Sequence, residues 1–129
     1  MIYIGTDKTT GLDVINLTRG DDGVLTVDLK APDGSDFVLS GEEYLILGVR
    51  QKPDHESELL IEVQSEPGSN EIQFRHQDTM DILPGEYSAD IQLMTRDAQR
   101  VTVWPMLTGG LRTRGNFKNF CLMSEVVDA

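Results

Sequence analysis

Two histidines, one cysteine and many carboxylates are the residues of this 129-residue chain that could carry out chemistry. A hydrolase of the triad type needs a nucleophile, a base and a group that orients the base. His55 stands in an acidic loop and His76 precedes Gln77 and Asp78, where a strand gives way to a helical cap. Neither histidine neighbours a serine or cysteine in a recognisable nucleophile turn. An uncharacterised enzyme is therefore only the third hypothesis, and we expect no catalytic residue.

Metal and cofactor sites are equally weakly supported by the sequence. Structural zinc needs about four Cys or His ligands at set spacings, and the chain has three such residues, scattered. No loop matches the calcium-binding pattern, although carboxylates that could offer oxygens to a cation stand at Asp33, Asp36, Asp54, Glu56 and Glu58. Adjacent carboxylates do not indicate the facing pair that a glycosidase requires. We expect no metal and no cofactor.

The charge of the chain is strongly acidic, with 22 Asp and Glu against 11 Lys and Arg and a formal net charge of −11. Such a surface repels nucleic-acid phosphates and anionic lipids, so we expect neither a nucleic acid nor a membrane as partner. It can steer the domain toward a basic partner, or simply be a solvated surface.

One segment reverses this charge. Residues 108–120 contain no acidic side chain, and Arg112, Arg114 and Lys118 all fall there. The segment lacks the Gly-Lys-Ser/Thr ending and the strand–loop–helix setting of a phosphate loop. Two interpretations stay open: a basic hairpin that docks on an acidic surface, including that of an identical subunit, or a disordered loop.

Cysteine usage and the chain start indicate the compartment. A single cysteine, Cys121, cannot form an internal disulfide, and its apolar neighbours favour a buried, unreactive thiol. No signal peptide opens the sequence and no apolar run approaches the roughly 20 residues of a membrane helix. These features predict synthesis in a reducing cytoplasm.

Apolar residues recur with a period of two, which is the strand signal. Pro-Gly, Pro-Asp and Gly-Asn pairs punctuate the runs, and a single helical turn is predicted at 78–81. Short strands at this spacing, without a long helix, predict one all-β domain over residues 1–129, an antiparallel β-sandwich of about 7–9 strands. The strands are expected at 24–29, 37–39, 44–50, 59–63, 72–74, 87–94, 99–107 and 117–127.

Tyr87 follows Leu83-Pro84-Gly85-Glu86 and opens an alternating strand. In sandwiches of the immunoglobulin class a tyrosine at that corner turns its hydroxyl back to the backbone just upstream. The sequence therefore predicts a structural tyrosine corner at Tyr87, with an ordinary half-buried strand tyrosine as the alternative.

Several short motifs follow one another in an order that resembles small phage and prophage proteins of Gram-positive bacteria and the N-terminal domain of phage baseplate upper proteins. They cover about residues 12–107 and 120–127: Leu17-Thr18-Arg19-Gly20-Asp21, Ala31-Pro32-Asp33-Gly34, Leu83-Pro84-Gly85-Glu86-Tyr87, Asp90-Ile91-Gln92-Leu93, Val103-Trp104-Pro105 and Ser124-Glu125-Val126-Val127. The resemblance implies an immunoglobulin-like sandwich and a place in the virion tail or baseplate. Residues 106–117 depart from it as an inserted basic hairpin or loop.

The leading hypothesis is therefore a non-enzymatic structural module that binds other phage proteins or its own copies as a homo-oligomer. The alternative is a carbohydrate- or host-surface-binding module on the same fold. Aromatic residues make up only 6% of the chain, and Trp104 and Tyr3 are the aromatics best suited to that alternative.

Overall fold

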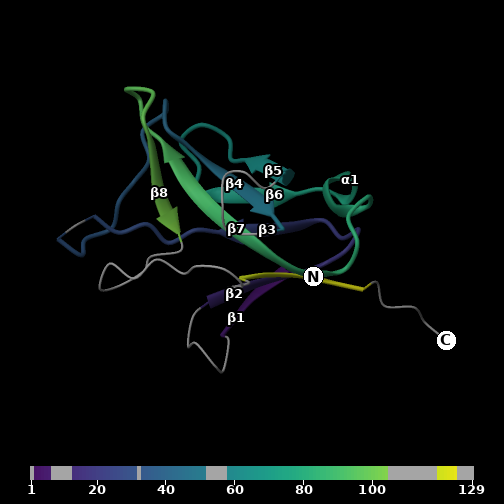
Figure 1. The fold of residues 1–129 in the computed structure, drawn as a ribbon. Helices are drawn as coiled ribbons and strands as arrows, with labels where there is room; N and C mark the ends of the chain where they lie inside the picture. The colour runs from purple at the N-terminus through teal and green to yellow at the C-terminus, as the bar shows by residue number, and fades with distance from the viewer. Residues whose placement is uncertain (1, 7–12, 32, 52–57, 105–118, 125–129) are drawn as a thin grey trace.

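The computed structural model describes residues 2–6, 13–31, 33–51, 58–104 and 119–124 (Figure 1). These residues form nine strands and one short helix, so the prediction of a mostly β fold is confirmed. In chain order the elements are β1 (Ile2–Thr6), β2 (Asp13–Thr18), β3 (Gly23–Thr26), β4 (Tyr44–Arg50), β5 (Leu59–Gln64), β6 (Glu71–Phe74), α1 (His76–Thr79), β7 (Gly85–Met94), β8 (Arg100–Trp104) and β9 (Phe120–Met123).

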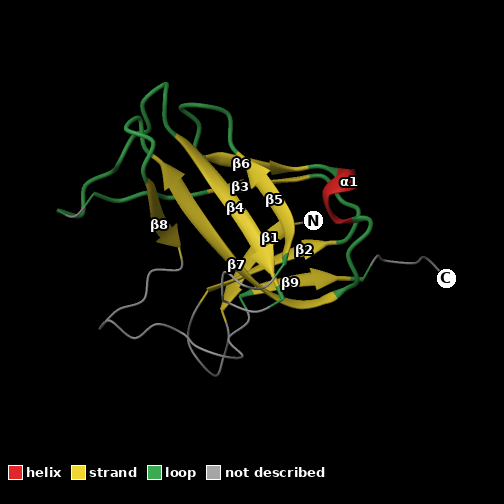
Figure 2. Cartoon of the chain, turned by 45° about the horizontal axis from the view of Figure 1, so that its top comes forward, coloured by secondary structure: helices red, strands yellow, loops and turns green. Residues whose placement is uncertain are grey.

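Seven of these strands form one sheet in the order β1-β2-β9-β7-β4-β5, with β8 also paired to β7, and β3 and β6 form a second, two-stranded sheet (Figure 2). All pairs are antiparallel except β2 and β9, which run parallel. The expectation of a wholly antiparallel architecture is therefore wrong at this pair. The expectation failed because side-chain alternation indicates which face of a strand is buried. It does not indicate whether the neighbouring strand runs parallel or antiparallel.

β4 is the most apolar strand, and it lies between β5 and β7. Leu45, Leu47 and Val49 on this strand are fully buried. Both sheets contribute to one hydrophobic core, and the rings of Phe74 on β6 and Phe120 on β9 meet across it with centroids 6.3 Å apart. Packing of these apolar faces is the main source of stability for a domain of this size.

The long strand β7 holds the larger sheet together because its two edges are both occupied. β4 pairs with it from Ser88 to Met94, and β8 pairs with the last part of that stretch on the opposite edge. β9 pairs with Gly85 to Tyr87. β8 and β9 therefore follow one another along a single edge of β7, and residues 105–118 link them in the sequence.

Asn119 fills the place where β8 and β9 separate. Its buried side chain acts as a short piece of strand: Oδ1 accepts the N–H of Ala89 at 2.6 Å, and Nδ2 donates to the carbonyl of Ala89 at 2.9 Å. Its main chain donates to the carbonyl of Tyr87 and accepts the N–H of Ile15. One residue thus connects β2, β7 and the start of β9.

Several element boundaries differ from the sequence-based expectation. The hairpin of β1 and β2 was not predicted, the strand expected at 24–29 ends at Thr26, and residues 37–39 form no strand. The helical turn begins at His76, two residues earlier than predicted, and Arg75 is its N-cap. Asp78 lies within the first turn, where its carboxylate accepts the N–H of Arg75 at 2.7 Å. The expected strand at 117–127 is described as the shorter β9.

The hydroxyl of Tyr87 donates a hydrogen bond to the carbonyl of Leu83, four residues upstream. The ring itself is buried and belongs to the core. This bond ties the chain that enters β7 to the first residues of that strand, and it satisfies the polar end of an otherwise apolar ring.

Replacing Asn119 by Leu keeps the number of side-chain heavy atoms, but two methyl groups take the place of the amide and leave the N–H and carbonyl of Ala89 unpaired. We expect the free energy of unfolding to fall by about 2–4 kcal/mol, because each buried unpaired group costs about 1–3 kcal/mol. Urea denaturation followed by circular dichroism measures this. Asn70→Leu is the control, since Asn70 bonds the carbonyl of Val27 from an exposed position where water replaces the lost bond. Equal losses for the two variants would contradict the role assigned to Asn119.

Replacing Tyr87 by Phe removes only the hydroxyl that bonds Leu83. We expect a loss of about 1 kcal/mol in the free energy of unfolding, with the fold retained. Tyr44→Phe removes the same atom from a half-buried tyrosine on β4 and serves as the comparison. A loss at position 87 no larger than that at position 44 would show that the hydroxyl bond contributes nothing.

Candidate functional site

An open groove of about 430 Å³ lies along β6, between that strand and β5. β5 ends the larger sheet and β6 belongs to the smaller one, so the groove lies where the two sheets approach one another without pairing. Its lining residues are Val24, Glu62, Val63, Gln64, Glu66, Ser69, Glu71, Gln73, Arg75 and Asp78. Apart from Val24 and Val63, all of these side chains are polar.

The wall formed by β5 presents main-chain hydrogen-bonding groups. The N–H of Ser65 donates to the carbonyl of Leu45 on β4 at 2.9 Å, so pairing with β4 uses the main chain of residues 61, 63 and 65. In an antiparallel ladder the intervening residues direct their main-chain groups the other way. The N–H and carbonyl of Glu62 and Gln64 therefore point to the outer edge, where no described strand pairs with β5.

The wall formed by β6 has the same property. The N–H of Val27 donates to the carbonyl of Asn70 at 2.9 Å, so by the same alternation the carbonyl of Glu71 and both main-chain groups of Gln73 face away from β3. The N–H of Glu71 is bonded by the hydroxyl of Ser69 at 3.1 Å. Two strand edges with main-chain groups directed outward thus border one groove.

The groove is also acidic, because among the described residues Glu62, Glu66, Glu71 and Asp78 line it together with one cation, Arg75. Within the part of the chain that the structure describes, no group of three or more His, Cys, Asp or Glu is arranged to hold a metal ion. Carboxylates beside outward-facing amide and carbonyl groups can bind an extended polypeptide that carries positive charge.

His76 is held by main-chain contacts at the turn between β2 and β3. The ring Nδ1 of His76 donates to the carbonyl of Gly20 at 2.8 Å, and the main-chain N–H of His76 donates to the carboxylate of Asp22 at 2.7 Å. The N–H of Gly20 in turn donates to the hydroxyl of Thr79 at 2.8 Å. The ring thus joins the turn at Arg19-Gly20-Asp21 to α1. His55 lies outside the described residues.

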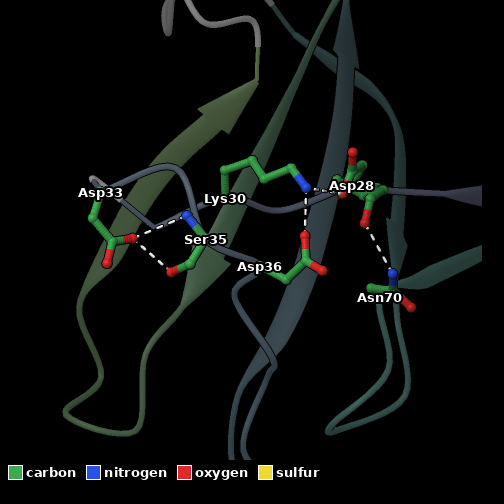
Figure 3. A network of polar contacts seen from close by, with 7 residues as sticks. Asp28, Lys30, Asp33, Ser35, Asp36 and Asn70 are labelled. Carbon is green, nitrogen blue, oxygen red and sulfur yellow. Dashed lines mark hydrogen bonds and ion pairs between the residues drawn. The ribbon is translucent and has the colours of Figure 1, made fainter.

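The acidic corner after β3 is an ion-pair network (Figure 3). Lys30 is paired with Asp36 and lies 3.5 Å from a carboxylate oxygen of Asp28. The hydrogen bond to Asp36, followed by the charges of Asp28 and Asp36, raises the pKa of Lys30, and Lys30 in turn lowers the pKa of Asp36. Hydrogen bonds from the hydroxyl and N–H of Ser35 lower the pKa of Asp33.

Other residues singled out from the sequence fall in different places. Trp104 at the end of β8 is partly buried against the core. Glu58 is exposed just before β5. The basic residues proposed for docking lie outside the described residues, as do two of the loop carboxylates: Arg112, Arg114, Lys118, Asp54 and Glu56.

Cys121 lies on β9 between two buried residues, Phe120 and Leu122, and its own side chain is half-buried. Burial raises the pKa of the thiol above its ordinary value, and the negative charge of Glu86, its partner across the strand pair, raises the pKa further. Both effects favour the thiol over the nucleophilic thiolate.

Comparisons of the chain with protein families, with curated protein sequences and with solved structures gave no match. In the described residues, no helix has the length and apolar character needed to cross a membrane.

The reactivity of Cys121 should depend on the charge of Glu86. Glu86→Gln removes the negative charge across the strand pair, which lowers the pKa of the thiol, so alkylation by iodoacetamide at neutral pH should become faster. Mass spectrometry of timed samples gives the rate. Glu62→Gln, on the strand at the far end of the sheet, should leave the rate unchanged. A slower or unaltered rate in the Glu86 variant would contradict this electrostatic account.

Proposed function

We propose that this chain is a non-enzymatic, protein-binding module of a bacteriophage or prophage tail or baseplate, folded as an immunoglobulin-like sandwich. It binds other structural proteins, its own copies included, through strand edges and charged surfaces. The observation that carries the proposal is the acidic groove in which the outer edges of β5 and β6 lie side by side.

The arrangement of strands supports the immunoglobulin-like assignment. In that fold one sheet contains strands C, F and G, extended in variable-type domains by C′, and the other contains B and E. β4, β7 and the β8–β9 edge correspond to C, F and G, and β5 corresponds to C′. β3 and β6 correspond to B and E, and the hydrogen bond from Tyr87 to Leu83 falls where strand F begins.

The chemistry of the groove supports binding as the function. Its groups are carboxylates, amides, one guanidinium and main-chain donors and acceptors. These groups recognise an extended chain by adding it as a further strand, with the main chain providing affinity and side chains providing specificity. A carboxylate-lined edge selects for a partner of opposite charge and slows the approach of acidic ones.

The order of the sequence motifs supports the place of action. Their resemblance to small phage proteins supports a place in the virion tail or baseplate, after synthesis in the cytoplasm of the bacterial host. Structural proteins of such particles act by repeated contacts between identical or related subunits, which closed symmetry turns into rings.

Sedimentation velocity of the full chain over a wide range of concentration tests this function, together with binding assays against the products of neighbouring tail genes. We expect concentration-dependent self-association or a complex with a tail protein, weakened by high salt because the surfaces involved are charged. A monomer at every concentration that also binds none of those proteins would overturn the proposal.

A further inference from the structure

We propose that the groove between β5 and β6 receives the basic segment around residues 111–114 of a second copy, which adds to the outer edge of β5 as an extra strand. This inference rests on the proposed protein-binding function and names both the site and its occupant. Three observations carry it: the outward-facing main-chain groups, the charge of the groove and the alternation within the basic segment.

The outer edge of β5 provides a regular hydrogen-bonding template. Glu62 and Gln64 direct their N–H and carbonyl groups away from β4, and no described strand pairs with them. These two residues offer two N–H donors and two carbonyl acceptors, so a short added strand can form four main-chain hydrogen bonds with them. An unpaired edge of this kind is a ready template for another chain.

The charges of the groove and of the basic segment are complementary. The described lining of the groove has four carboxylates and one guanidinium, whereas residues 108–120 carry three cations and no acidic side chain in a protein of net charge −11. Among all segments of this acidic chain, the basic one is therefore the segment that the groove attracts most.

The sequence Leu111-Arg112-Thr113-Arg114 alternates in the manner of a strand with one charged face. In an extended conformation, Arg112 and Arg114 project to one side and Leu111 to the other. Beside β5, the charged side lies next to the exposed Glu62, and the other side lies over the buried row that contains Val63. Opposite charges on neighbouring strands stabilise their pairing.

The topology favours a contact between copies. The basic segment leaves from Trp104 and returns at Asn119, both on the β8–β9 edge of β7, whereas the groove is bounded by β5 at the end of the sheet. β7 and β4 lie between these two places. A contact that joins different surfaces of identical subunits is heterologous, and such contacts propagate into rings or filaments.

A charge-exchange experiment tests this inference with the full chain. One variant reverses the groove (Glu62→Lys with Glu71→Lys), and a second reverses the segment (Arg112→Glu with Arg114→Glu). We expect each to weaken self-association at least about tenfold, which corresponds to about 1.4 kcal/mol. An equimolar mixture of the two should associate again, as should a chain with all four substitutions, because opposite charges then face one another. Sedimentation velocity measures the extent of association of the original chain, of each variant and of the mixture.

Matched controls separate a local effect from net charge. Asp13→Lys with Asp97→Lys changes the net charge as much as the groove variant does, and Arg96→Glu with Arg100→Glu matches the segment variant; all four residues are exposed and outside the groove. Thermal unfolding checks that each variant folds. Both controls should associate like the original chain.

Three results would overturn the inference: a groove variant that associates normally, a mixture that remains monomeric, or an original chain that is monomeric throughout. If the mixture or the original chain is monomeric, the binding assays with tail proteins decide separately whether the proposed protein-binding function holds. A chain that binds those proteins without binding itself retains the proposed function and loses this occupant.

Discussion

The double hydrogen bond between Asn119 and Ala89 is the contact on which the larger sheet depends. Without it, the edge of β7 would present an unpaired N–H and carbonyl in the interior at the place where β8 and β9 separate. A buried amide side chain can replace one residue of a strand because it offers the same donor and acceptor. The side chain of Asn119 thus completes the edge of β7 between the end of β8 at Trp104 and the start of β9 at Phe120, and the core beneath that edge stays closed.

Alternation in the sequence predicted β5 and β7, whose apolar residues recur in steps of two. β4 was predicted from a nearly continuous apolar run, and that composition fits its position between two neighbouring strands. The hairpin of β1 and β2 was missed, since the alternation of Ile15 and Leu17 is brief and was not read as a strand. The parallel pairing of β2 with β9 could not be predicted, because it joins segments about a hundred residues apart and depends on the complete topology.

The groove was beyond sequence reasoning for a related reason. Glu62 and Glu71 read as ordinary exposed positions on two alternating strands, and nothing local indicates that no described strand pairs with the outer edge of β5 or of β6. The signal that was present is the short turn between the two strands, Glu66-Pro67-Gly68-Ser69-Asn70. That turn takes the chain directly from the edge of one sheet to the other sheet, with no intervening strand to cover either edge. His76 is the opposite case, because its residue type suggested catalytic chemistry. Its contacts in the structure are those of a structural link between a turn and α1.

Carboxylates on an open strand edge have two consequences that together favour one kind of assembly. Two β5 edges that approach one another bring Glu62 against Glu62, and like charges on paired strands are destabilising. Natural sheets use charged residues on their edges in this way to prevent self-pairing. The same carboxylates attract a strand whose exposed face is cationic. An edge of this composition therefore disfavours a symmetric contact between identical edges and favours a contact with a different, basic surface. Residues 108–120 carry three cations and no acidic side chain, so they provide such a surface, and this physical asymmetry is sufficient to set the direction in which copies would add to one another.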